Sequence, residues 1–189
     1  MLKNDLNDWI SFLLNSYDAH TVIRMEEEED YEGVERERRS YNMSLMKAFH
    51  HELAGDDSKS YLERYDMFFT LSYALKMFED VVFDQDLIYS DITEIESSMD
   101  RFLTRLIIKT GDINDEIFDS SLNAILEFYR FLESRGVVSD FADLEEEANE
   151  LREEFREKMH AYDLARHSGD RNVKEKARVK LFGGLCWSL

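Results

Sequence analysis

The chain alternates between long stretches with a helical spacing of apolar residues and short polar breaks. In each stretch the apolar residues recur every three or four positions, which places them on one face of a helix. The pattern predicts helices over about residues 3–24, 34–53, 59–83, 91–109, 113–135, 140–168 and 171–181.

Short segments with glycine separate several of these stretches. Gly55, Gly111 and Gly169 are each followed directly by an aspartate. Glycine tolerates the left-handed backbone that ends a helix, and aspartate accepts hydrogen bonds from the free N–H groups that open the next one. Proline, which interrupts helices, does not occur in the 189 residues. We therefore expect residues 1–189 to form one all-α domain, a bundle of six to seven mostly antiparallel helices with more than about 65% helix.

Two stretches depart from the simple one-sided pattern. Residues 59–83 are apolar on most sides, which predicts a helix in the middle of the bundle. Residues 26–30 are consecutive acids, and like charges so close together oppose a regular helix. They predict a loop or a frayed turn, with a solvated continuation of the helix as the alternative.

The stretch 140–168 has a narrow apolar seam of alternating three- and four-residue spacing, which Lys158 interrupts. Such spacing over about four heptads is typical of coiled coils, so we expect part of this seam to form a homodimer. The candidate interaction residues are Leu144, Leu151, Phe155 and Tyr162, together with Trp187 in the apolar C-terminal tail.

Composition and charge limit the partners and the cellular location that we expect for the protein. Hydrophobic residues make up 43% of the chain, which is enough for a sizeable core, and the net charge is −19. An acidic surface repels nucleic acids and anionic membranes and favours basic partners, although it also serves solubility alone. Cys186 is the only cysteine, so no intrachain disulfide forms. With no basic signal-peptide region and no apolar run of about 20 residues, we expect a cytoplasmic protein that does not bind membranes.

The C-terminal segment carries the opposite charge. Residues 166–189 contain six bases and two acids, a net charge of +4, which leaves −23 on the rest. A basic helix can bind phosphates, so one hypothesis is a nucleic-acid regulator that acts through residues 166–180. The apolar stripe Val173, Ala177 and Leu181 favours instead a basic helix and apolar tail, residues 170–189, packed on the acidic bundle or on a second copy.

One cluster of residue types indicates metal chemistry as an alternative. His50 and His51 lie at the end of the second predicted helix, and Glu63 and Asp66 lie near the start of the third. In a helical hairpin these four side chains come near one another, and imidazole and carboxylate groups both bind zinc or iron. This alternative is a metal-dependent hydrolase built on a helical bundle.

Two acidic motifs resemble those of a known enzyme family. Glu32-x-x-Glu35 followed by Glu63-x-x-Asp66 resembles the paired motif of the all-α nucleotide pyrophosphohydrolases, which bind magnesium between two helices. The resemblance implies nucleotide hydrolysis. In a hairpin that turns near Asp56, however, the two motifs would lie about 20 Å apart along the helix axis.

A third motif has the spacing of di-iron proteins. Glu157-x-x-His160 is the spacing that di-iron bundles use, but those sites need two such motifs. His160 and His167 both lie about 140° around the helix from the apolar seam, so we expect them to face water.

Sequence signatures of phosphate-binding loops and of hydrolase nucleophile turns do not occur in the chain. The interpretation that accounts for most of these features is a non-enzymatic helical interaction or regulatory protein. We expect it to have an acidic surface, to associate with itself and to need no cofactor.

Overall fold

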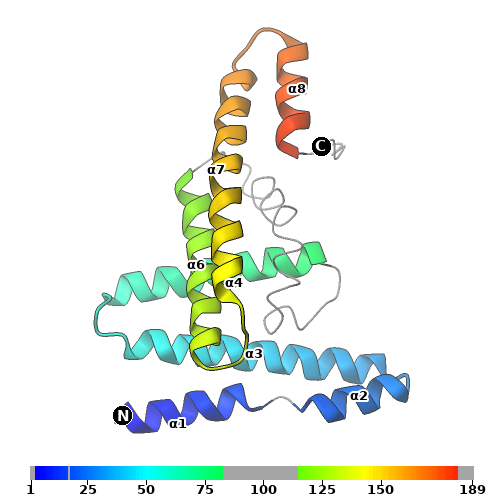
Figure 1. Cartoon of the computed structure of the whole chain (residues 1–189), viewed down its shortest axis with the longest axis vertical. Helices are drawn as coiled ribbons and strands as arrows, with labels where there is room; N and C mark the ends of the chain where they lie inside the picture. The colour runs from blue at the N-terminus through cyan, green and yellow to red at the C-terminus, as the bar shows by residue number, and fades with distance from the viewer. Residues whose placement is uncertain (1–2, 17, 83–114, 183–189) are drawn as a thin grey trace.

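A computed structural model describes residues 3–16, 18–82 and 115–182 (Figure 1). Of these positions 85% are helical and none lies in a strand, so the protein is an all-α single-domain bundle. The described helices are α1 (Lys3–Leu14), α2 (Ala19–Glu27), α3 (Tyr31–Gly55), α4 (Tyr61–Val82), α6 (Asp115–Ser134), α7 (Phe141–Arg166) and α8 (Arg171–Phe182). The predicted helix 91–109 lies outside the described residues.

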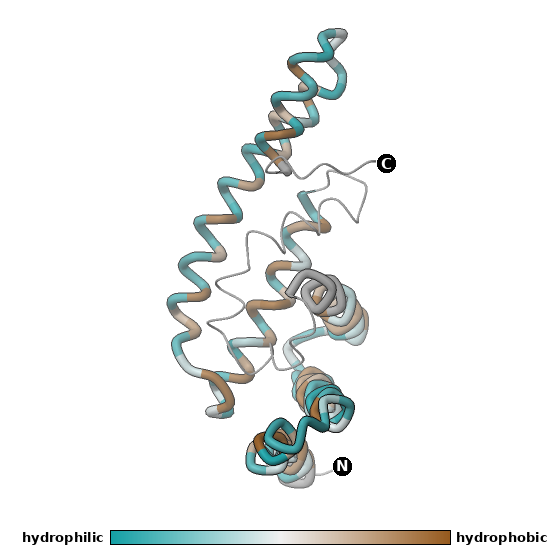
Figure 2. Tube along the Cα trace, turned by 90° about the vertical axis from the view of Figure 1, so that its right-hand side faces the viewer, coloured by the Kyte–Doolittle hydropathy of each residue, from teal (hydrophilic) through white to brown (hydrophobic). Residues whose placement is uncertain are grey.

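The helices form two layers that cross steeply (Figures 1 and 2). In the first layer α3 and α4 form an antiparallel pair, and α1 and α2 lie along α3. In the second layer α6 and α7 form another antiparallel pair, and α8 folds back along α7. The antiparallel arrangement expected from the sequence therefore holds within each pair, whereas the two pairs cross one another.

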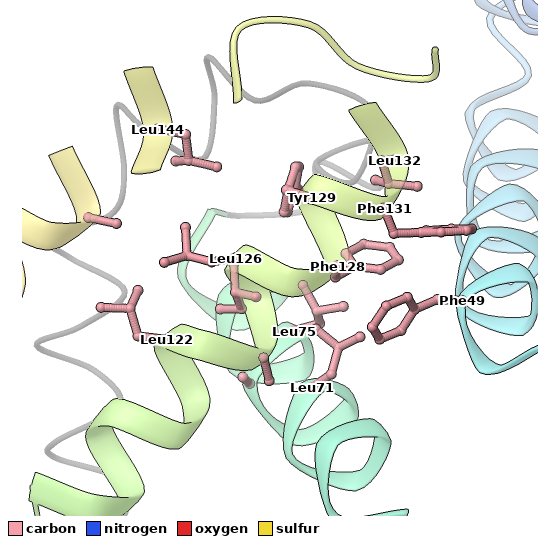
Figure 3. Packing of buried hydrophobic residues seen from close by; sticks show 14 of the residues in the cluster. Phe49, Leu71, Leu75, Leu122, Leu126, Phe128, Tyr129, Phe131, Leu132 and Leu144 are labelled. Carbon is pink, nitrogen blue, oxygen red and sulfur yellow. The ribbon is translucent and has the colours of Figure 1, made fainter. Parts of the chain in front are cut away.

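The core lies where the two layers meet. Leu71 and Leu75 of α4 face Phe128 of α6, and Phe49 of α3 packs against the cluster from the right in Figure 3. The Phe49 and Phe128 rings meet edge to face, with their centroids 5.3 Å apart. Small buried residues such as Ala124 allow the helices to approach closely, and the resulting cluster joins helices from both layers.

The prediction of one helix over residues 3–24 is wrong, because the structure has a break between α1 and α2. Polar side chains near the break bond to nearby backbone in place of the helical ladder. The Ser16 hydroxyl donates to the Leu13 carbonyl oxygen at 2.7 Å. Asp18 then caps α2 by accepting a hydrogen bond from the His20 N–H at 3.1 Å. Short polar side chains compete with helix in this way, and they end α1.

The acidic run at residues 26–30 is half helix and half turn. Glu26 and Glu27 complete α2, and Arg38 of α3 pairs with Glu26 at 2.7 Å. Glu29 then adopts a left-handed backbone with φ of 58°, and Asp30 caps α3 by accepting from the Gly33 N–H at 3.0 Å. The predicted turn is therefore confirmed for residues 28–30, where like charges coincide with the reversal between two helices.

The basic helix α8 packs along the C-terminal half of α7, and Leu181 is buried there. Val173, from the same predicted stripe, stays exposed. Trp187 and the remaining tail lie outside the described residues, so the docking of the tail stays a prediction.

Candidate interaction surface

Within residues 61–75 of α4, whose side chains the structure describes, five large side chains are exposed along the outer face, and we call them the aromatic row: Tyr61, Leu62, Tyr65, Phe69 and Tyr73. Tyr61 is 72% exposed and Phe69 is 61% exposed. The Tyr65 ring lies nearly parallel to both neighbours, with centroid distances of 6.4 Å to Tyr61 and 6.3 Å to Phe69. Residues four apart are neighbours on a helix, so this spacing makes a continuous strip about 18 Å long.

On the opposite face of α4, residues 71, 74 and 75 are fully buried. Leu71, Ala74 and Leu75 belong to the core that α4 shares with α6. The expectation that α4 lies in the middle of the bundle is therefore wrong for the outer face, because α6 packs on the other face of α4. A signal in the sequence indicates this face: three of its five residues are tyrosines, whose hydroxyl groups tolerate water.

A shallow pocket of about 200 Å³ lies beside the aromatic row, between α3 and α4. Its walls come from His50, Leu53 and Ala54 of α3 and from Tyr61, Arg64, Tyr65 and Phe68 of α4. The Arg64 guanidinium donates to the Ala54 carbonyl oxygen at 2.9 Å, which ties α4 to the last turn of α3. The His50 and Phe68 rings lie 4.7 Å apart and form the floor between the two helices.

Ring contacts continue from this pocket to α1. His50 lies beside His51 with a centroid distance of 6.1 Å, and His51 meets Trp9 at 6.4 Å. Trp9 stacks on Phe12 at 5.3 Å, and both of these side chains are exposed. We call the aromatic row together with Trp9 and Phe12 the aromatic surface.

Acidic groups border the aromatic surface. Asp57, Glu63 and Asp66 are exposed in and beside the first turns of α4. Glu63 accepts a hydrogen bond from the Ser60 N–H at 2.6 Å, and its own N–H donates to the Ser60 hydroxyl oxygen at 3.3 Å. This reciprocal capping lowers the pKa of the Glu63 carboxyl, because the hydrogen bonds favour the charged form. The border of the aromatic surface is therefore anionic at neutral pH.

The four metal-ligand candidates do not form one group. His50 and His51 lie side by side, whereas Glu63 caps its own helix through Ser60. Nowhere in residues 3–16, 18–82 and 115–182 do three or more histidine, cysteine, aspartate or glutamate side chains gather closely enough to hold a metal ion. In the motif that resembles pyrophosphohydrolases, Glu35 pairs with Arg39 at 2.5 Å.

These positions lead to a prediction for metal binding. Titration with Zn²⁺ or Mn²⁺ should give no stoichiometric binding, because His50 and His51 without a third ligand make an incomplete site. Isothermal titration calorimetry measures this. One tight equivalent of metal that disappears when His50 and His51 are both changed to Ala would instead support the metal-enzyme alternative.

His160 and His167 face water, as the periodicity predicts. Their side chains are 64% and 72% exposed, and His160 pairs with Asp115 of α6 at 2.8 Å. This contact joins the first turn of α6 to α7 at the surface of the molecule.

The seam on α7 packs within the chain itself. Leu144 and Phe155 are buried in the core, and Leu151 and Tyr162 are half-buried against it. Leu144 and Phe155 thus contribute to the fold, and a homodimer through part of this seam stays a prediction. Trp187 lies beyond the described residues.

Comparison with family models, with curated proteins and with solved structures finds no match to this chain. No helix in the described part of the chain is both long enough and apolar enough to cross a membrane.

Proposed function

We propose that this protein is a non-enzymatic interaction protein that associates with a second copy of itself through the aromatic surface. The observation that carries the proposal is the aromatic row, a strip of exposed side chains on α4 at helical spacing. Contiguous apolar patches of this size are uncommon on monomers and mark interaction sites.

The exposed area fits the needs of a dimer. The seven side chains of the aromatic surface are between 39% and 72% exposed. With about 150–250 Å² for each aromatic side chain, they leave on the order of 800 Å² uncovered. A standard protein interface takes about 800 Å² from each partner. A second copy is thus matched to this surface in size, whereas a small ligand in the shallow pocket would leave most of it uncovered.

The same chain also supplies a partner of complementary charge. The aromatic surface has the acidic border Asp57, Glu63 and Asp66, whereas α8 exposes basic side chains at the other end of the molecule. Two copies can therefore satisfy each other's charges without a further protein.

The double variant Tyr65→Ser with Phe69→Ser tests the proposal. At tens of micromolar we expect the wild-type protein to sediment as a dimer and the variant as a monomer, because the variant loses the centre of the apolar strip. Sedimentation equilibrium measures the mass, and circular dichroism checks that the helix content is unchanged.

Tyr31→Ser is the control, since Tyr31 is even more exposed than Tyr65 and Phe69 but lies at the opposite end of α3 from the pocket. It should leave the dimer intact. A wild-type protein that stays monomeric, or a double variant that still dimerises, would overturn the proposal.

A further inference from the structure

Helix α8 has an outer face that is both basic and apolar. Lys176, Lys180, Val173 and Val179 are all exposed, and each valine is 45% exposed. At 100° per residue these four lie within an arc of about 120°, at about 80° (Val173) to 160° (Val179) around the helix from the buried Leu181. We call them the basic face of α8.

The two lysines of this face have no anionic partner among residues 3–16, 18–82 and 115–182. The acid in the middle of α8, Glu175, is held by Arg178 through hydrogen bonds of 2.6 and 3.0 Å. Lys176 and Lys180 form no ion pair with any residue in the described part of the chain. Their charges are therefore available to a partner.

Helices α7 and α8 also carry this face away from the body. The C-terminal half of α7 and the whole of α8 extend beyond the crossing of the two layers (Figures 1 and 2). We call this projecting hairpin the arm. Its position leaves the basic face open to another molecule.

We infer that the arm of one copy lies on the aromatic surface of the other, with the basic face of α8 against the aromatic row. This inference rests on the proposed function and names the element of the second copy that fills the surface. Lysine ammonium groups bind over tyrosine rings, and the valines of α8 add apolar contact. The acidic border, in particular Asp66, meets the remaining positive charge.

An arm that reaches from each copy to the other gives a closed pair. Each copy then contributes one arm and one aromatic surface, and the two contacts are related by a twofold axis. Reciprocal exchange also doubles the contact area without requiring a self-complementary face.

Charge reversal on the arm provides the first test. Lys176→Glu with Lys180→Glu should weaken the dimer by at least about tenfold, because it sets two acids against an acidic border. Lys174→Glu is the matched control, because Lys174 is exposed on the same helix but lies about 160° around it from Lys176. It should change the dissociation constant less than about twofold.

Mixing two variants provides the deciding test. We combine the Lys176→Glu, Lys180→Glu protein, which has an intact aromatic surface, with the Tyr65→Ser, Phe69→Ser protein, which has an intact arm. A contact from arm to surface can form once between these two proteins, so a heterodimer should appear in sedimentation velocity although each variant alone is a monomer. A contact of one intact aromatic surface with another cannot form between the two different variants, so it would give no heterodimer.

The outcomes separate the two proposals. Suppose that the Lys176→Glu, Lys180→Glu protein dimerises as tightly as wild type while the Tyr65→Ser, Phe69→Ser protein is a monomer. The inference about the arm is then wrong, and the proposed function stands. The absence of a heterodimer in the mixture counts against the arm in the same way. A wild-type protein that is monomeric overturns both.

Discussion

Phe128→Ala should lower the free energy of unfolding by about 3–5 kcal/mol, which is the range for removing a large aromatic side chain from a packed core. The Phe128 side chain is fully buried where the two layers cross. Its ring meets the Phe49 ring of α3 at 5.3 Å and the Tyr129 ring at 5.6 Å. The variant leaves a cavity among side chains from α3, α4 and α6, so urea denaturation should show a much lower midpoint.

Phe12→Ala is the matched control for this measurement. The substitution is the same, but Phe12 of α1 is exposed, so at protein concentrations that leave the wild type monomeric its removal should change the free energy of unfolding by no more than about 0.5 kcal/mol. If the two substitutions changed the free energy of unfolding equally, the core would not lie where the two layers cross.

Sequence periodicity located the described helices well after residue 30. The predicted and observed limits of α4, α6, α7 and α8 differ by two residues or fewer at each end. These helices have long apolar repeats bounded by glycine and aspartate. A long repeat locates a helix correctly even when its first or last residue is assigned one or two positions away. The break at residues 15–18 escaped prediction because the apolar spacing continues through it. The decisive contacts there are side-chain hydrogen bonds of Ser16 and Asp18, which an apolar repeat does not register.

The exposure of the aromatic surface could not be predicted from the sequence, for a different reason. The sequence predicts that α4 is apolar on nearly every side, and the structure agrees. Periodicity does not say which side another helix covers when two sides are apolar. That choice depends on the steep crossing of the two layers, which buries Leu71 and Leu75 and leaves Tyr65 and Phe69 outside.

The sequence located the α7 seam, and in the structure Leu144 and Phe155 of this seam pack inside the chain. Lys158 interrupts the spacing in the sequence, but in the structure Met159 supplies the next buried side chain instead. Lys158 turns outward to Glu154, and its ammonium lies 4.9 Å from the centre of the Phe155 ring. The seam therefore continues from Phe155 through Met159 and packs inside the chain. A coiled-coil spacing predicts that a helix face is covered, but it does not distinguish a partner copy from a neighbouring helix.

The contrast between Leu144 and Leu164 tests this assignment of the α7 seam. Both are leucines of α7, but Leu144 is fully buried and extends towards α6, whereas Leu164 is 77% exposed (Figure 3). Leu144→Ala should lower the free energy of unfolding by about 2–5 kcal/mol, because it removes core contacts and leaves a cavity. Leu164→Ala should change it by no more than about 0.5 kcal/mol.

The same pair of variants distinguishes a core seam from a dimer seam. If Leu144 stabilises the monomer, its loss should lower the urea midpoint by the same amount at every protein concentration that leaves the wild type monomeric. The folded Leu144→Ala protein should then still dimerise at tens of micromolar through the aromatic surface. A dimer seam gives the opposite result, because the variant monomer would be as stable as wild type and only its dimerisation would fail. That result would return the interaction surface to α7 and remove the reason for placing it on α4.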